Sequence, residues 1–357
     1  MFMDYYHSLV SSINRALDAF LSEQIDSVKD NSFLEFFYRR VHSFLSSGGK
    51  RIRPVLLLLS AGSISPSIFS DSLYRISLSV ELLHNASLIH DDIMDNADTR
   101  RGFPAFHRFF TDYSSDTYSF ESLDSSNYGL SMGILGGDLV YNLSYRTLHS
   151  SDFSPSLLLR VAAEFNEGFL RVIKGVIFET DLMARFEVTE KEYFEMIDGK
   201  TAALFEKSAR MGAILADGTP SQIDALGKFA KNAGLAFQVV DDIIGVFGNP
   251  KKTGKPVDSD IREGKKTILL IKALENASSD QKKSLYSIVG NRNASSEDIS
   301  LVRGIFKDTG ALQYARAKAE ELFESCKYFL DTADPAIDST YRDYLLELAQ
   351  MGIHREK

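Results

Sequence analysis

The chain has 357 residues, of which 44% are hydrophobic, a formal net charge of -9 and one cysteine. This length and apolar content are enough for a large buried core, whereas acidic charge without a long basic patch argues against a nucleic-acid-binding protein. A lone cysteine excludes an intrachain disulfide, and no signal-peptide pattern opens the chain, so we expect a cytoplasmic protein. The longest uninterrupted apolar run, Val55–Leu59, is too short to cross a bilayer.

Helical periodicity runs through most of the chain. Apolar residues recur at spacings of three and four, most clearly in 34–45, 78–89 and 226–237, and long alternating patterns typical of strands are absent. Several prolines stand where helices would begin or end, such as Pro155 and Pro220. The pattern predicts an all-α protein, and no Pro/Gly-rich linker divides it into separate domains.

The segment Gly48–Pro54, GGKRIRP, places Lys50, Arg51 and Arg53 around a flexible turn just before an apolar stretch. Glycine permits a close approach of the backbone to a ligand, and arginine offers two parallel donors to phosphate oxygens. The segment is a candidate phosphate-binding turn, although a solvated helix start would also account for it.

The predicted helix that contains 78–89 ends in an acidic cluster, Asp91, Asp92 and Asp95, which Arg100 and Arg101 follow. Residues three and four apart share a helix face, so Asp91 and Asp95 point the same way with Asp92 beside them. His84 lies two turns earlier on roughly the same face. This alignment favours a phosphate contact for His84 over simple packing in the core.

Two further segments are predicted as irregular. Residues Thr111–Asn127 are rich in Ser, Asp and Tyr and are expected to form a surface loop. A helix break is expected at Lys200 and Thr201, which follow Asp198 and Gly199, and this break would direct Lys200 toward the site.

A second acidic pair, Asp241 and Asp242, lies on another periodic stretch, with Gln238 one turn earlier on the same face. Lys255 and Lys265 follow it, partly within a predicted loop over residues 251–264. Carboxylates suit Mg²⁺, which keeps several waters and shares phosphate oxygens with its substrate. Two acidic motifs with flanking cations therefore predict a clamp for a metal and a diphosphate.

With these motifs the chain resembles the trans-isoprenyl diphosphate synthases of the polyprenyl synthetase family. Six segments match in the family's order and spacing, covering roughly residues 45–270: Gly48–Pro54, Glu81–His107, Gly133–Tyr141, Gly199–Glu206, Phe237–Gly248 and Thr253–Thr267. The resemblance implies one all-helical domain over residues 1–357, an isoprenoid synthase-type bundle around a central cavity, usually assembled as a homodimer.

The resemblance also implies a reaction, the Mg²⁺-dependent condensation of isopentenyl diphosphate with an allylic diphosphate to a trans-polyprenyl diphosphate. The implied isopentenyl diphosphate contacts are Lys50, Arg53, His84 and Arg101. The implied ligands of three Mg²⁺ ions are Asp91 and Asp95 for two ions and Asp241 for the third, supported by Asp92 and Asp242. The implied allylic diphosphate contacts are Arg100, Lys200, Thr201, Gln238, Lys255 and Lys265.

Two positions depart from the family's pattern. Gly245 stands where many relatives have a third aspartate, and Val176 stands where relatives often have glutamine. Because Asp241 carries the main metal role in the second motif, activity is expected to survive the first departure.

The stretch His84–Leu88, HNASL, resembles the geranylgeranyl diphosphate class, so geranylgeranyl diphosphate is the expected product. Ala86 and Ser87, one turn before the aspartates, are expected to line the chain cavity, and Phe165 or Phe178 could close it. A farnesyl or longer-chain product is the alternative.

Two other protein classes use related features. A class I terpene cyclase would need a different second metal motif and no isopentenyl site, whereas this chain has the intact Gly48–Pro54 segment. A non-catalytic regulatory subunit commonly loses an aspartate motif, and both are largely present here. An assay of the purified chain alone separates these readings.

Overall fold

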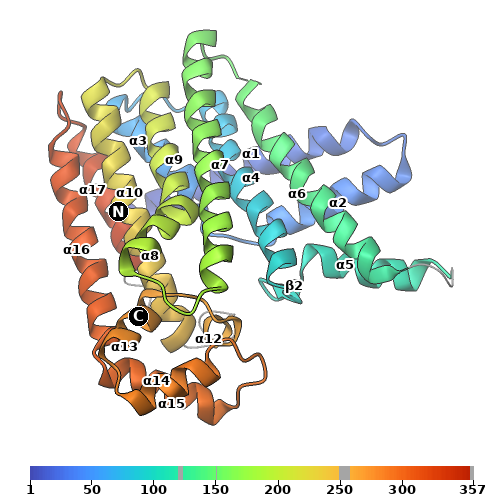
Figure 1. Cartoon of the computed structure of the whole chain (residues 1–357). Helices are drawn as coiled ribbons and strands as arrows, with labels where there is room; N and C mark the ends of the chain where they lie inside the picture. Colours follow the sequence, from blue (N-terminus) through green and yellow to red (C-terminus); the bar gives the residue numbers. More distant parts are fainter. Residues whose placement is uncertain (120–123, 150, 249–257, 354–357) are drawn as a thin grey trace. The chain divides into compact units, whose positions relative to one another are not determined.

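The computed structural model describes residues 1–119, 124–149, 151–248 and 258–353. Within these ranges the regular structure is helical (Figure 1), apart from a hairpin of two short strands, β1 (Thr99–Arg100) and β2 (Phe103–Pro104). The predicted all-α class is therefore confirmed. Lys255 lies outside the described residues. No helix in the described ranges has the length and apolar character needed to span a membrane.

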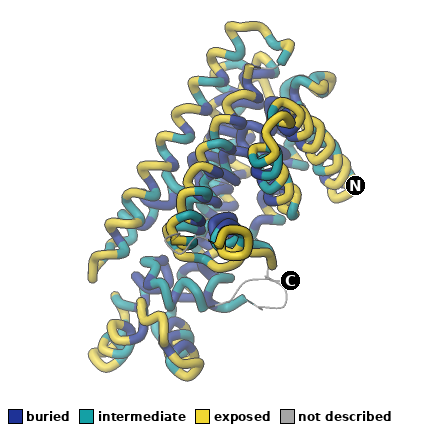
Figure 2. Tube along the Cα trace, turned by 90° about the vertical axis from the view of Figure 1, so that its right-hand side faces the viewer, coloured by how far each residue is buried: buried dark blue, intermediate teal, exposed yellow. Residues whose placement is uncertain are grey.

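The chain forms two compact units, residues 1–163 with 214–216, and residues 164–213 with 217–357. The prediction of a single domain stays a prediction. In both units buried and exposed positions alternate along the helices with the helical period (Figure 2), as the spacing of apolar residues predicts.

The first unit is arranged around a central helix, α4. Its helices are α1 (Phe2–Asp26), α2 (Ser32–Ser46), α3 (Ile52–Ile64), α4 (Asp71–Met94), α5 (Phe106–Thr117), α6 (Ser125–His149) and the first part of α7 (Pro155–Met183). Helix α4 packs against α1, α3, α5 and α6. Its residues Ile76–Leu83 are all buried, which is the mark of a helix inside a core.

Helix α6 approaches its neighbours closely because glycines replace side chains on the contact face. A Cβ on Gly137 would overlap the His90 ring, whose Cε1 would lie 2.7 Å away, and a Cβ on Gly133 would lie 2.7 Å from Ile93 Cδ1. Interiors packed at this density yield little to added atoms. The matching segment Gly133–Tyr141 thus has a packing role beside α4, where His90 also contacts the Ile134 carbonyl oxygen (3.1 Å).

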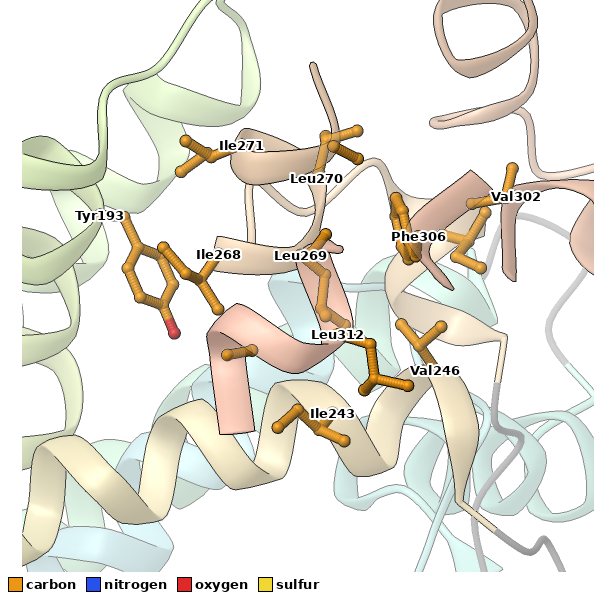
Figure 3. Packing of buried hydrophobic residues seen from close by; sticks show 14 of the residues in the cluster. Tyr193, Ile243, Val246, Ile268, Leu269, Leu270, Ile271, Val302, Phe306 and Leu312 are labelled. Carbon is orange, nitrogen blue, oxygen red and sulfur yellow. The ribbon is translucent and has the colours of Figure 1, made fainter. Parts of the chain in front are cut away.

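The second unit is arranged around α10. Its helices are the rest of α7, α8 (Glu190–Ile197), the π-helix η1 (Asp198–Ala202), α9 (Ala203–Leu215), α10 (Pro220–Phe247), α12 (Ser259–Glu263), α13 (Ile268–Asn276), α14 (Ser279–Ile288), α15 (Ser296–Asp308), α16 (Ala311–Asp331) and α17 (Ser339–Ile353). Helix α10 packs against α16, α17, α13 and η1. Figure 3 shows Ile243 and Val246 of α10 among Leu269, Phe306 and Leu312 of the neighbouring helices.

The prediction of a surface loop over Thr111–Asn127 is wrong for its two ends. Residues 111–117 complete α5, and residues 125–127 begin α6, while 120–123 lie outside the described residues. The Tyr113 ring packs against Phe36 of α2 with centroids 4.8 Å apart. This tertiary contact overrides the loop-like composition of the segment. The predicted loop 251–264 is likewise helical over Ser259–Glu263, and 251–257 lie outside the described residues.

Candidate active site

Three residues of the Gly48–Pro54 turn have positive φ angles, and two of them are glycines. Gly48 and Gly49 have φ angles of 110° and 137°, which glycine adopts readily, and Arg51 stands in the left-handed region at φ 51°. A Cβ on Gly49 would lie 3.3 Å from Arg51 Nη1 and 3.5 Å from Arg101 Nη2. The glycine therefore lets two arginines approach the turn.

Arg51 anchors this turn inside the first unit. Its Nη1 donates to Glu81 Oε1 of α4 (2.6 Å), its Nε to Asn14 Oδ1 of α1 (3.0 Å), and its Nη2 to the Leu45 carbonyl at the end of α2 (2.8 Å). Both members of the Arg51–Glu81 ion pair are buried. With all three nitrogens occupied, Arg51 fixes the position of the turn, whereas the Lys50 side chain beside it is exposed.

Arg101 lies at the turn of the β1–β2 hairpin, where Arg101 and Gly102 both have positive φ (53° and 80°). Two-residue hairpin turns of this kind require positive φ at both central positions. Its Nη2 donates to Asn85 Oδ1 (3.3 Å), and Asn85 is itself held by Glu81 (3.0 Å). Its Nη1 is buried and has no hydrogen-bond partner among the described residues. A buried guanidinium N–H left without an acceptor can donate a hydrogen bond to an anion.

His84 is surrounded by positive charge. Burial, and then the charges of Arg53, Arg101, Arg100 and Arg51, lower the pKa of His84 well below its ordinary value. The imidazole is therefore neutral at neutral pH. Four arginines acting on one side chain concentrate positive charge at this end of α4, as a diphosphate site requires.

The first aspartate motif forms the last turn of α4, and its members have different environments. Asp91 and Asp95 are half-buried and share a face, with the Asp95 N–H bonded to the Asp91 carbonyl (2.8 Å). Asp92 is completely buried and accepts from Arg100 Nε (2.8 Å) and Nη2 (2.5 Å). Asp92 thus supports the motif by holding Arg100, and two of the three Arg100 nitrogens already bind a carboxylate.

In the second unit the predicted helix break is wrong, because the chain continues through Lys200 and Thr201 as the π-helix η1. The Ala203 N–H bonds to the carbonyl of Asp198, five residues earlier. Lys200 Nζ pairs with Glu179 Oε2 of α7 (2.5 Å), and Thr201 Oγ1 donates to Gln238 Oε1 of α10 (2.7 Å). Single π-turns inside helices occur frequently at functional sites.

In the second aspartate motif one carboxylate is likewise in the core and the other is on the surface. Asp242 is buried and accepts from Tyr193 Oη (2.7 Å) and Gln238 Nε2 (2.8 Å), whereas Asp241 is exposed. Burial, and then the negative charge of Asp260, raise the pKa of Asp242 to about 8. No sequence pattern indicated Tyr193, whose hydroxyl extends into this core from α8 (Figure 3).

Position 245 has no room for an aspartate side chain in this structure. A Cβ at this position would overlap the Asp260 carboxylate, whose Cγ would lie 3.0 Å away. Lys265 Nζ lies 3.6 Å from Asp260 Oδ1 and 3.0 Å from Glu263 Oε2. The carboxylate beside position 245 is thus supplied by Asp260 of α12.

Ala86 and Ser87, the predicted chain-length residues, lie on α4. Ala86 is buried, and the half-buried Ser87 donates its hydroxyl to the His84 carbonyl (2.8 Å). Phe165 is buried and Phe178 half-buried on α7. The roles of these residues in setting product length stay predictions.

The site residues thus form one group in each unit. In the first unit Arg53, His84, Arg100, Arg101 and Asp92 act on one another electrostatically or by hydrogen bonds. In the second unit Thr201, Gln238 and Asp242 form a continuous hydrogen-bonded chain.

No three His, Cys, Asp or Glu side chains within the described ranges are arranged to hold a metal by themselves. Mg²⁺ is usually held by one or two carboxylates together with substrate phosphates. Asp91 and Asp95 on one helix face supply hard oxygen ligands of the required type.

A family model described as polyprenyl synthetase matches residues 35–305. The chain belongs to this family. It is therefore a prenyltransferase. The geranylgeranyl diphosphate synthase of Saccharolobus solfataricus is 33% identical, over 99% of this chain and 98% of the relative. The geranylfarnesyl diphosphate synthase of Aeropyrum pernix is also 33% identical, over 88% of this chain and 92% of the relative.

Among solved structures, the geranylgeranyl pyrophosphate synthase from Corynebacterium glutamicum, complexed with isoprenyl diphosphate and magnesium, superposes with a TM-score of 0.91. It is 32% identical and covers 97% of this chain and 98% of its own. The likeness confirms the predicted isoprenoid synthase fold and the enzyme class. The role of each polyprenyl synthetase site residue in this chain stays a prediction.

The anchoring function of Arg51 is testable by its effect on stability. We expect Arg51→Met to destabilise the protein by about 3–5 kcal/mol, because it leaves Glu81 charged and buried without its partner. The control is Arg39→Met, which removes an exposed pair with Glu35 (2.6 Å) and should cost about 0.5 kcal/mol or less. Urea denaturation of both variants measures the difference, and equal midpoints would contradict the anchoring function.

Proposed function

We propose that the protein condenses isopentenyl diphosphate with allylic diphosphates in a Mg²⁺-dependent reaction, with geranylgeranyl diphosphate as its main product. The observation that carries this proposal is the group of arginines around His84, with the buried, unpartnered Nη1 of Arg101, at the end of the helix whose last turn bears Asp91 and Asp95. Concentrated cations beside hard carboxylate ligands are suited to a magnesium diphosphate.

The proposed binding roles are those that the resemblance to the polyprenyl synthetases implies. Lys50, Arg53, His84 and Arg101 bind isopentenyl diphosphate. Arg100, Lys200, Thr201, Gln238, Lys255 and Lys265 bind the allylic diphosphate. Asp91 and Asp95 would hold two Mg²⁺ ions, and Asp241 would hold a third. When bound, the metal withdraws charge from the oxygens of the departing diphosphate.

The side chains of the chain itself stabilise the charges of the reaction. Ionisation of the allylic carbon–oxygen bond leaves negative charge on the diphosphate, which arginine and lysine donors fixed in advance stabilise without reorganising. The neutral His84 offers the isopentenyl diphosphate a hydrogen bond without adding to the repulsion among the arginines. The Gln238 carbonyl oxygen and the carbonyls of η1 present partial negative charge to the allylic cation. The double bond of isopentenyl diphosphate attacks this cation to form the new carbon–carbon bond, and the released diphosphate accepts the proton that then leaves the adduct.

The product assignment is supported by the 33% identical geranylgeranyl diphosphate synthase over nearly the whole chain. A longer-chain product is the second candidate, because a geranylfarnesyl diphosphate synthase is equally similar over a smaller part of the chain. A terpene cyclase or a non-catalytic subunit is disfavoured by the intact Gly48–Pro54 turn and by aspartates in both motifs.

We also propose that the protein forms a homodimer through α7. Leu170, Ile173 and Ile177 are 41%, 40% and 64% exposed and lie on one face of this helix at helical spacing. Apolar stripes exposed to this degree mark contact surfaces. The second copy is the occupant that the resemblance implies.

The dimer is tested by placing a charge on this face. Ile177→Glu should convert the protein to a monomer, because a carboxylate in an apolar interface loses its hydration. Leu301→Glu on α15, which replaces a 49% exposed leucine, is the control and should leave the mass unchanged. Light scattering after size-exclusion chromatography measures both, and a wild-type protein that is monomeric would refute the proposal.

Metal dependence is tested by chelation together with substitutions at the aspartates. Asp91→Ala and Asp241→Ala should each lower kcat by roughly 10²–10³, by analogy with the loss of one charge-stabilising group from an active site. Asp242→Asn should lower it far less, because the amide can keep contacts to Tyr193 and Gln238. Rates are measured with purified protein, isopentenyl diphosphate and farnesyl diphosphate at fixed Mg²⁺. Full activity after exhaustive chelation would refute the proposed reaction.

Product length is tested at Ala86. Ala86→Phe should shorten the product toward farnesyl diphosphate, because the prenyl tail cannot extend through a volume filled by a ring. If Ala86 only packs against a neighbouring helix, the variant loses thermal stability and keeps its product. Chromatography of dephosphorylated products, together with thermal denaturation, distinguishes the two results. A stable, active variant with an unchanged product rules out the cavity assignment.

A further inference from the structure

One face of α7 contacts η1 through three successive turns. Arg171, Gly175 and Glu179 lie four residues apart on the same face. Arg171 binds the first residue of η1, Gly175 touches its backbone, and Glu179 pairs with Lys200. The π-turn is therefore held by consecutive turns of a single helix.

The guanidinium of Arg171 spans the π-turn. Its Nη2 donates to Asp198 Oδ2 (2.9 Å), at the start of η1, and its Nη1 donates to Glu206 Oε2 (2.7 Å), one turn into α9. Asp198 is the first residue of the π-turn and Glu206 follows the turn, so the two carboxylates lie at its two ends along the chain. A planar guanidinium can bind both at once, which a lysine ammonium cannot do with the same geometry.

Two glycines bring the backbones of α7 and η1 together between these ion pairs. A Cβ on Gly175 would overlap the backbone of Lys200 and lie 2.7 Å from the Gly199 carbonyl carbon. A Cβ on Gly199 would lie 2.9 Å from the Arg171 carbonyl oxygen. A π-turn costs regular hydrogen bonding, so its persistence here requires contacts of this kind.

The other side of η1 is attached to α10. Lys231 Nζ lies 2.9 Å from Asp198 Oδ1, and Thr201 donates to Gln238. Side chains of α7 and α10 thus both bind the Asp198 carboxylate. The backbone carbonyl of the same residue accepts the π-helical hydrogen bond from the Ala203 N–H.

We infer that Arg171 and Asp198 are positioning residues, which form a bracket across the π-turn and thereby set the direction of Lys200 and Thr201. The inference rests on the proposed function, in which Lys200 and Thr201 bind the allylic diphosphate. Neither Arg171 nor Asp198 needs to touch the substrate. Loss of the bracket lets the turn relax toward regular α-helix, which rotates Lys200 and Thr201 away from their present directions.

A matched control is present in the same unit. Arg210 Nη2 pairs with Glu164 Oε1 (2.9 Å), and this pair also joins α9 to α7 but lies outside the π-turn. The side chains of Arg171 and Arg210 are similarly exposed, at 20% and 25%. Arg210→Gln therefore removes a comparable ion pair without removing the bracket.

The experiment compares Arg171→Gln, Arg171→Lys and Asp198→Asn with Arg210→Gln. The three bracket variants should raise KM for the allylic diphosphate roughly tenfold to a hundredfold, the scale expected when binding groups are misplaced by about 1 Å, with little change in KM for isopentenyl diphosphate. Arg210→Gln should alter thermal stability alone. A change in both KM values, equal effects of Arg210→Gln, or wild-type kinetics in Arg171→Lys would overturn the bracket.

Hydrogen exchange supplies a readout that does not depend on catalysis. The amides of residues 198–203 should exchange faster in Arg171→Gln than in Arg210→Gln, because each conversion between the π-turn and regular helix breaks the bond from Ala203 to Asp198 and exposes these amides. Unchanged protection in Arg171→Gln would overturn the inference even in an active enzyme. A wild-type protein without condensation activity would instead refute the proposed function, and the exchange data would still decide whether the bracket holds the turn.

Discussion

Adjacent residues on an α-helix are turned by about 100° from each other, so two neighbouring aspartates cannot point the same way. Both acidic motifs of this protein follow that constraint. Asp92 and Asp242 are buried, while Asp91 is half-buried and Asp241 is exposed. One carboxylate of each pair is directed into the fold and the other is left accessible to a ligand.

The inward carboxylates bind side chains that have proposed roles in substrate binding or that are hydrogen-bonded to such groups. Asp92 binds Arg100 of strand β1, and the hairpin that follows carries Arg101 at its strained turn.

Asp242 binds the Gln238 amide, which in turn accepts from Thr201 of η1. Each acidic motif is therefore also a structural connection, from the core of its unit to a segment with proposed diphosphate contacts. A substitution at Asp92 or Asp242 would be expected to act through these segments rather than through lost metal binding.

The sequence predicted those features of the fold and the site that depend on residues close together in the chain. Helical periodicity predicted the helices, and the i, i+4 spacing placed Asp91 and Asp95 on one face. The contact of Tyr113 with Phe36 is a tertiary feature, and it turned a loop-like composition into the end of α5.

The π-turn was likewise hidden from local reasoning. Asp198 and Gly199 suggested a break, because their intrinsic helix propensities are poor. The structure instead packs η1 against Gly175 and the Arg171 guanidinium, more than twenty residues earlier in the chain, and the helix continues with a wider turn. Long-range contacts of this kind leave no periodic signal in the segment that they stabilise.

The arginines of the first unit show the same limit most clearly. In the sequence Arg51, Arg100 and Arg101 are equivalent cations near two motifs, and guanidinium groups all carry five donors. The structure separates them by their hydrogen bonds. Arg51 has acceptors on all three nitrogens, whereas Arg100 has a carboxylate on two.

Arg101 differs from both, because its Nη1 is buried without an acceptor in the described part of the chain. A buried donor without an acceptor costs stability unless a ligand supplies one. The number of guanidinium nitrogens with an acceptor in the described part of the chain thus falls from three in Arg51 to two in Arg100 and one in Arg101. The same residue type can fix a turn or receive a substrate, and the difference lies in how many of its donors the fold has already satisfied.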